Sequence, residues 1–270
     1  MAVLRKLAAP LIRPGLVVAA GEVSIAAAGA KSEVLKVHSF DYDVYLRVRN
    51  AAGSLPEGRA GDAAASAPKG YAVFVDQDLC FHPDFVRQGI PFVVTPAKYF
   101  PSLCAGLRRI AHALDLDVRI AAHPRASYLK RGIDYFEGFD VRQGGTAELI
   151  RDCRAVVCHD STAIHFAVLF DKPMIFFTTD ELVPSFEGRS IAQAAAELGK
   201  SPINLDRDLL QVDWHREIGM DAAKYRAYRN KFIKIDGTPE RPMWDVIIDH
   251  IERAQADEYS KFSSSFEVSP

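Results

Sequence analysis

The sequence predicts an α/β fold in which helices cover both faces of a parallel β-sheet. Short apolar runs alternate with amphipathic stretches from residue 71 onward, which is the pattern of strands and helices in such folds. The runs are continuously apolar, as strands of a buried parallel sheet are. The composition, with 49% hydrophobic and 25% charged residues, is that of an ordinary globular protein. The 270 residues suffice for one large domain or two small ones.

The N-terminal region is predicted to hold two strands, 15–24 and 33–38, and a short helix, 41–49. The stretch that follows, 50–70, is rich in Ala, Gly, Ser and Pro, and this composition indicates a flexible connection. We therefore expect residues 1–69 to form a partial N-terminal region with a linker.

The main domain is expected over residues 70–258, and a flexible tail over 259–270. Its four strands are predicted from the apolar runs at 71–76, 117–123, 155–159 and 174–179. Its helices are predicted from apolar periodicity and capping residues, and they span 100–114, 146–153, 161–170, 190–198, 221–233 and 242–254. The stretch from Pro83 to Pro96 also contains Gly89 and Pro91, and we predict a loop there.

Several classes of protein do not fit the composition. The formal net charge of −2 lacks the basic excess of nucleic-acid-binding proteins. The sequence contains neither a GxGxxG nor a Walker A motif, which argues against NAD-linked redox chemistry and ATP hydrolysis. No group of His, Cys and Asp has metal-ligand spacing. We therefore expect no metal, no cofactor and no nucleic-acid partner.

The cysteines and the hydropathy indicate a cytoplasmic protein. The four cysteines lack CxxC spacing, so we predict that all four are reduced packing residues. No apolar stretch approaches the roughly 20 residues that a membrane span needs. The inner face of the membrane stays open as a place where the protein would meet a lipid-linked acceptor.

The turn after the second strand of the main domain carries His123, Pro124 and Arg125. In parallel α/β sheets, ligands bind outside the carboxyl ends of the strands. An imidazole and a guanidinium at that place can donate hydrogen bonds to a phosphate. The alternative is a polar turn without a ligand.

A second candidate follows the third strand, where Asp160, Ser161 and Thr162 precede a predicted helix. Two hydroxyls and the free backbone N–H groups of a first helical turn form an anion site. A plain helix N-cap is the alternative. Glu148, on a neighbouring short helix, is either a ribose contact or an exposed helical acid.

The acids nearest to these turns are Asp76 and Asp78, which follow the first strand of the main domain and precede a His82-Pro83-Asp84 segment. A carboxylate at a strand end can act as a general base if its pKa is suitably tuned. Asp76 is equally well explained as an acid that begins a loop and accepts backbone N–H groups.

His123-Pro124-Arg125, the segment from Ala155 to Ala163 and the segment from Phe170 to Phe177 together resemble the C-terminal, donor-binding domain of GT-B glycosyltransferases. They are most similar to bacterial sialyltransferases and polysialyltransferases that use CMP-activated sugars, and to related capsule and lipooligosaccharide enzymes. The resemblance covers roughly residues 71–179 and implies a Rossmann-like fold. It also implies that His123 binds the donor phosphate and assists the departure of CMP, and that Ser161 and Thr162 hold the same phosphate.

The same resemblance implies a glycosyltransferase that moves a sugar, with a CMP-activated 2-keto acid sugar favoured as donor, to a cell-surface glycan or lipid-linked acceptor. Those enzymes carry their base in an Asp/Glu-Asp/Glu-Gly motif, which is absent here, so Asp76 and Asp78 are the nearest candidates. Residues 1–69 are too few for a full acceptor domain, which implies a truncated or minimal version, or a partner chain that supplies the missing half. A sugar-nucleotide epimerase, a glycerophosphate-type transferase and a non-catalytic nucleotide-binding subunit remain as alternatives.

Overall fold

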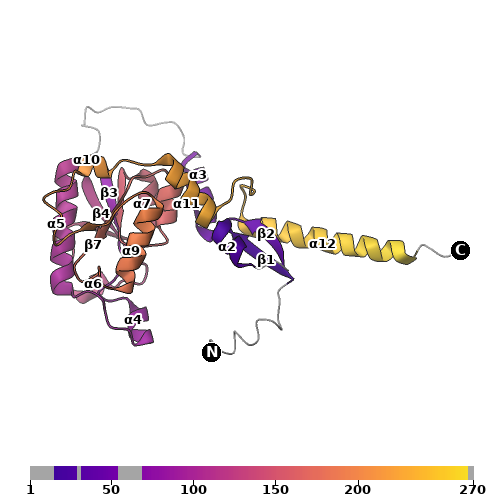
Figure 1. Cartoon of the computed structure of the whole chain (residues 1–270), viewed down its shortest axis with the longest axis horizontal. Coiled ribbons are helices and arrows are strands. Elements are labelled where there is room, and N and C mark those ends of the chain that lie inside the picture. Colours follow the sequence, from indigo (N-terminus) through magenta and orange to yellow (C-terminus); the bar gives the residue numbers. More distant parts are fainter. Residues whose placement is uncertain (1–14, 29–31, 54–68, 267–270) are drawn as a thin grey trace. The chain divides into compact units, whose positions relative to one another are not determined.

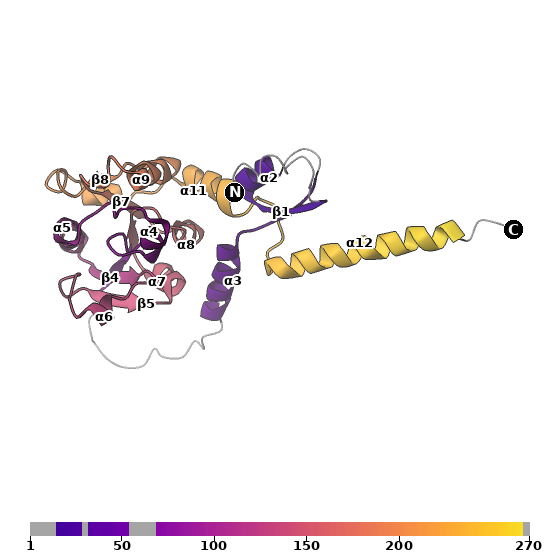
Figure 2. The ribbon, with the colours of Figure 1, turned by 90° about the horizontal axis from the view of Figure 1, so that it is seen from below.

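The computed structural model describes residues 15–28, 32–53 and 69–266. The chain forms two compact units, which Figures 1 and 2 show from two directions. One unit comprises the chain up to Ala51 together with Arg229 onward, and the other runs from Ala52 to Tyr228. We call them the terminal unit and the sheet unit.

The sheet unit is built on six parallel strands in the order β5-β4-β3-β6-β7-β8. The strands are β3 (Tyr71–Val75), β4 (Asp117–Ala122), β5 (Asp140–Gln143), β6 (Ala155–Cys158), β7 (Met174–Thr178) and β8 (Ile203–Asn204). The predicted parallel sheet is thus confirmed. Every residue of β3, β6 and β7 is buried, as expected for the central strands of a sheet covered on both faces.

Helices cover the sheet from both sides, with α5 on one face and α7 and α9 on the other (Figure 1). The helices of this unit are α4 (Pro83–Gln88), α5 (Pro96–Leu114), α6 (Tyr128–Arg131), α7 (Thr146–Asp152), α8 (Ile164–Leu169), α9 (Phe186–Glu197), α10 (Trp214–Glu217) and α11 (Ala222–Tyr228). The predicted apolar face of α5 is confirmed at Leu103, Leu107 and Ile110, which are fully buried.

Several predicted boundaries in the sheet unit were wrong. The stretch predicted as a loop contains α4, because Pro83 occupies a first helical turn, where a proline is tolerated. For the same reason α5 begins at Pro96 rather than at residue 100. α9 begins at Phe186 rather than at residue 190, because the Ser185 side chain accepts a hydrogen bond from the backbone N–H of Gly188. Strands β5 and β8 were not predicted.

The terminal unit contains a pair of parallel strands, β1 (Leu16–Ala20) and β2 (Glu33–Val37). It also contains α2 (Gly21–Ala27), α3 (Phe40–Gly53), the π-helical turn η1 (Arg229–Ile233) and α12 (Met243–Phe266). The predicted strand 15–24 was wrong beyond Ala20. Gly21 adopts a left-handed conformation with φ of 73° and begins α2, and a Cβ there would lie 2.6 Å from the Lys231 carbonyl oxygen.

The two units divide the chain differently from the predicted domains, since residues from 229 onward group with the N-terminal strands rather than with the sheet. Val37 of β2 packs against Met243, Val246 and Ile247 of α12. The predicted tail 259–270 is helical as far as Phe266, and 267–270 lie outside the described residues. Most of the predicted connection, 54–68, also lies outside them.

Candidate functional site

A cavity of about 510 Å³ lies at the carboxyl edge of the sheet, where ligands bind in parallel α/β folds. Its lining comes from the end of β3 and the turn after it, the end of β4, the turn after β6, and the first turns of α7 and α9. His123, Ser161 and Thr162 all line it. The two strand-end motifs, which begin 38 positions apart in the sequence, therefore face one common space.

His123 follows β4 directly and is half-buried in the cavity wall. The backbone N–H of Arg125 donates to its Nδ1 over 3.3 Å, so Nδ1 is the unprotonated nitrogen of the neutral ring and Nε2 carries the hydrogen. Burial lowers the pKa of His123, and the neighbouring His82 lowers it further. The ring is therefore neutral at pH 7 and offers an N–H donor.

Ser161 and Thr162 lie in the turn between β6 and α8. The predicted helix start at residue 161 was wrong, because α8 begins only at Ile164. The N–H groups of Ala163, Ile164 and His165 donate within the turn, to the Ser161 hydroxyl, the Ser161 carbonyl and the Thr162 carbonyl respectively. These three N–H groups, which were predicted to be free for an anion, therefore already donate within the protein. The two hydroxyls remain as the groups that can contact an anion.

Asp76 follows β3 and lines the cavity, although its side chain is only 3% exposed. Its carboxylate accepts hydrogen bonds from the backbone N–H of Asp78 (3.0 Å), the backbone N–H of His123 (3.1 Å) and the Tyr128 hydroxyl (3.0 and 3.1 Å). Burial raises the pKa of Asp76 to about 6 in spite of these bonds. The carboxylate ties the ends of β3 and β4 together and so fixes the position of His123.

Asp78 is buried and adopts a left-handed backbone conformation with φ of 53°. It is not among the residues that line the cavity. Its Oδ1 has no hydrogen-bond partner within the described part of the chain, and burial raises the pKa of its carboxyl group.

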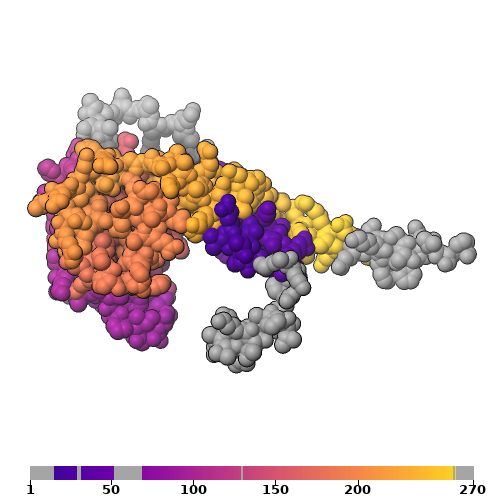
Figure 3. All heavy atoms as spheres, in the orientation of Figure 1, coloured from indigo at the N-terminus to yellow at the C-terminus, as the bar shows by residue number. Residues whose placement is uncertain are grey.

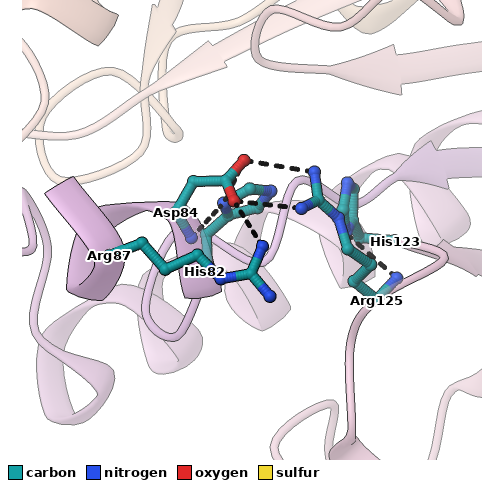
Figure 4. A network of polar contacts seen from close by, with 5 residues as sticks. All are labelled: His82, Asp84, Arg87, His123 and Arg125. Carbon is teal, nitrogen blue, oxygen red and sulfur yellow. Dashed lines mark hydrogen bonds and ion pairs between the residues drawn. The ribbon is translucent and has the colours of Figure 1, made fainter.

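The side chains of Arg125 and Glu148 do not line the cavity. The Arg125 guanidinium donates to both carboxylate oxygens of Asp84, over 3.0 and 3.1 Å, as Figure 4 shows. This bidentate pair uses two of the five N–H groups of the guanidinium that was predicted to face a phosphate. Glu148 is an exposed acid in the first turn of α7, which matches the second of its two interpretations.

Four polar residues in the cavity wall were not predicted as site residues: Gln77, His82, Thr146 and Glu187. Gln77 accepts a hydrogen bond from the backbone N–H of Asp160, which joins the turns after β3 and β6. Glu187 lies in the first turn of α9, and its Oε2 has no hydrogen-bond partner among the described residues. A serine cap followed by Glu187 is a sequence sign of a helix start that would have placed this carboxylate near the sheet edge.

His159, at the end of β6, belongs to the core and not to the cavity. It is fully buried, and its Nδ1 lies 2.7 Å from the Phe177 carbonyl oxygen. A carbonyl only accepts, so Nδ1 carries the hydrogen and Nε2 accepts from the Tyr99 hydroxyl over 2.8 Å. Burial lowers the pKa of His159 to about 4, and the ring stays neutral.

The remaining expectations concern cysteines, metals and membrane spans. The four cysteines are free and buried, and burial raises the pKa of Cys80, Cys104 and Cys153 to about 12, which confirms that they are packing residues. Within the ranges that the structure describes, no cluster of His, Cys, Asp or Glu has the arrangement of a metal site. No helix in those ranges combines the length and apolar character needed to cross a bilayer.

No protein-family model and no curated protein sequence matches this chain. Among solved structures, it is similar to the glycotransferase of kitacinnamycin, with 14% identity, a TM-score of 0.40, and coverage of 74% of this chain and 46% of that one. It is also similar to the UDP-GlcNAc 2-epimerase of Methanocaldococcus jannaschii, with 12% identity, a TM-score of 0.42, and coverage of 80% and 60%. It is similar as well to the glycosyltransferase SnogD from Streptomyces nogalater, with 13% identity, a TM-score of 0.38, and coverage of 84% of this chain and 58% of that one.

The chain thus spans about half the length of the solved structures it matches. Similarity at this level of identity and TM-score assigns neither a family nor an activity. The α/β architecture rests on the strand order and pairing described above.

Proposed function

We propose that this chain binds a nucleotide sugar through its phosphate and acts in transferring the sugar to an acceptor. The observation that carries the proposal is the shared cavity: His123, Ser161 and Thr162 reach it from two different strand ends. A volume of about 510 Å³ is within the range of small-molecule sites. The place at the carboxyl edge of a parallel sheet is where such folds bind nucleotides.

The chemistry of the wall suits a departing phosphate. The neutral His123 ring donates through Nε2, and the hydroxyls of Ser161, Thr162 and Thr146 can donate as well. Donors that are held in place before the reaction stabilise the negative charge that grows on the leaving nucleotide, which is usually the largest catalytic contribution. His123 is therefore the proposed catalytic residue on the donor side.

The carboxylates divide into two kinds. The oxygens of Asp76 accept from three different groups of the protein, so we assign it the task of positioning His123. Glu187 lines the same cavity, and its Oε2 has no hydrogen-bond partner among the residues that the structure describes. We propose that Glu187, rather than Asp76 or Asp78, accepts a hydrogen bond from a hydroxyl group of the donor or of the acceptor.

The resemblance of the His-Pro and Ser-Thr segments to CMP-sugar-dependent enzymes supports a CMP-activated 2-keto acid sugar as donor. The proposed acceptor is a cell-surface glycan or a lipid-linked sugar, which a cytoplasmic enzyme would meet at the inner face of the membrane. The cavity-bearing unit offers donor-side residues, and we propose that the acceptor site involves a partner chain.

A thermal-shift panel of CMP, CDP, UDP, GDP and ADP tests the proposal. A ligand that binds only the native state raises the melting temperature by mass action, and we expect the largest rise with a cytidine nucleotide. The matched variant is Ser161→Ala with Thr162→Val, which removes both hydroxyls and should reduce the rise. Lack of any rise with all five nucleotides would contradict the proposal.

A second measurement separates the reactions. We expect CMP to be released from a CMP-activated 2-keto acid sugar, more slowly in His123→Asn. Formation of a 2-epimer from UDP-GlcNAc would instead identify an epimerase. Tight nucleotide binding without turnover of any donor, together with a stable complex with a second chain, would identify a non-catalytic subunit.

A further inference from the structure

His82 and His123 form a pair of imidazoles in the cavity wall. Their ring centroids are 4.8 Å apart and their planes are inclined by 63°, and both residues line the cavity. They come from different turns, since His82 ends the loop after β3 and His123 follows β4. Figure 4 shows both rings with the charged residues around them.

Both rings are bonded to the backbone in the same way. The N–H of Asp84 donates to Nδ1 of His82, and the N–H of Arg125 donates to Nδ1 of His123, each over 3.3 Å. A nitrogen that accepts a hydrogen bond carries no hydrogen, so each neutral ring has its hydrogen on Nε2. Neither Nε2 has a protein partner among the described residues. The pair therefore leaves two N–H donors for a ligand.

The two turns are joined by the residues that follow each histidine. Asp84, two residues after His82, and Arg125, two residues after His123, form the bidentate pair. Arg87 lies 3.6 Å from the same carboxylate. None of the residues of α4 is buried, and in Figure 3 the region of α4 lies at the margin of the sheet unit. The pair of Asp84 with Arg125 thus adds a side-chain link between the His82 turn and the turn after β4.

We propose that His82 and His123 act together as a two-donor site for the phosphate oxygens of the bound nucleotide, and that Asp84 and Arg125 are positioning residues that hold the two rings side by side. The inference rests on the proposed function and adds His82 as a second contact to the phosphate. Two oxygens of one phosphoryl group, or one from each group of a diphosphate, can accept from rings at this separation.

Two substitutions of His82 distinguish the contribution of Nε2 to phosphate binding from that of Nδ1 to the turn. Asparagine places an acceptor near the position of Nδ1 and caps helices well, but it has no group at Nε2. Glutamine has an amide near Nε2 and no acceptor at Nδ1. We therefore expect His82→Asn to bind CMP and UDP about tenfold more weakly than the wild-type chain, with an unchanged melting temperature. We expect His82→Gln to keep more of the affinity and to lose stability.

His215→Asn is the control, because His215 is exposed on α10 and lies outside the cavity; it should bind both nucleotides as the wild type does. Isothermal titration calorimetry on the full chain gives the affinities. Long-range ¹H–¹⁵N spectra of the imidazoles should show the hydrogen on Nε2 in both rings, and both Nε2 signals should shift on addition of nucleotide.

The outcomes distinguish this inference from the proposed function. A wild-type chain that binds neither nucleotide overturns both. A wild-type chain that binds nucleotide while His82→Asn binds equally well overturns the paired site and leaves the proposed function standing. Spectra with the hydrogen on Nδ1 of either ring would also overturn the paired site.

Discussion

The buried carboxylate of Asp76 is the residue on which the geometry of the cavity most depends. It fixes the turn of His123 through a backbone hydrogen bond and is itself held by Tyr128. Burial of a carboxylate is costly unless it is hydrogen-bonded, and burial raises the pKa of Asp76 to about 6 even though its hydrogen bonds lower it.

This raised pKa gives a pH dependence of stability. Between the ordinary pKa of 3.8 and the folded value of about 6, the folded state binds more protons than the unfolded state, so stability falls as the pH rises through this window. The shift corresponds to about 3 kcal/mol. We expect the free energy of unfolding of the wild type, relative to that of Asp76→Asn, to fall by about 2 kcal/mol from pH 4 to pH 7, because the unfolded carboxyl group is already partly ionised at pH 4. Urea unfolding at both values tests it, and a constant difference would contradict it.

Arg125 and Asp84 give a prediction that separates positioning from direct contact. If they act only as a pair, Arg125→Gln and Asp84→Asn should each weaken nucleotide binding by the same small factor. The double variant should then be no weaker than either single one, because both remove one interaction. Calorimetric titrations of the three variants measure this. A far larger loss in Arg125→Gln alone would mean that the guanidinium binds the phosphate, as the sequence suggested.

At the residue scale, the sequence indicates which strand ends carry polar groups but not what those groups touch. The motifs around His123 and Ser161 were recognisable because each follows an apolar run. The pairing of Arg125 with Asp84 was not, because the partner lies 41 positions away in sequence and on a helix that resembled a loop. Glu187 was missed because the first turn of α9 was placed too late.

At the scale of elements, α9 carries Glu187 to the cavity, and its start is fixed by close packing at Gly188. A Cβ at this glycine would lie 2.1 Å from the Leu182 carbonyl oxygen, closer than any real contact. The glycine is thus required by the backbone of the preceding turn and not by its own conformation.

Gly188→Ala should therefore destabilise the protein, by about 1 to 3 kcal/mol, as overpacking does. Helix propensity alone predicts the opposite sign, a gain of about 1 kcal/mol. The matched control is Ala192→Gly at an exposed position of the same helix, which measures the ordinary difference between the two residues. A more stable Gly188→Ala variant in urea unfolding would contradict the packing argument.

The elements that the sequence predicted correctly are those with a strong local signal. β3, β6 and β7 are continuous apolar runs, and α5 repeats its apolar residues with the helical period. β5 has the sequence Asp-Val-Arg-Gln and β8 has two residues. β5 and β8 are the two edge strands of the sheet. Each is held by hydrogen bonds to one neighbouring strand, and neither has the continuous apolar run by which a strand is recognised in a sequence.

At the scale of the whole molecule, the chain consists of two compact units, and every residue that lines the cavity belongs to the sheet unit. The predicted domain boundaries missed this division because the segment from residue 229 onward returns to the N-terminal strands. This segment packs on the N-terminal strands through contacts between β2 and α12, which are far apart in the sequence. The periodicity of apolar residues along the chain does not reveal such contacts.

Ile247→Ala tests the separateness of the two units. This residue is 7% exposed and packs in the core between β2 and α12, and its truncation should cost about 2 to 5 kcal/mol there. Hydrogen exchange should become faster in β2 and α12, while the nucleotide affinity stays within twofold of the wild-type value. A large loss of affinity would show that the terminal unit contributes to the site.

The central claim is that two strand-end motifs of the sheet unit share one phosphate. A crystal structure of the full chain with cytidine monophosphate tests it most directly. The phosphate is expected within hydrogen-bond distance of the His123 imidazole and of the Ser161 or Thr162 hydroxyl. A nucleotide bound elsewhere, or bound here with its phosphate turned away from both motifs, would contradict the claim.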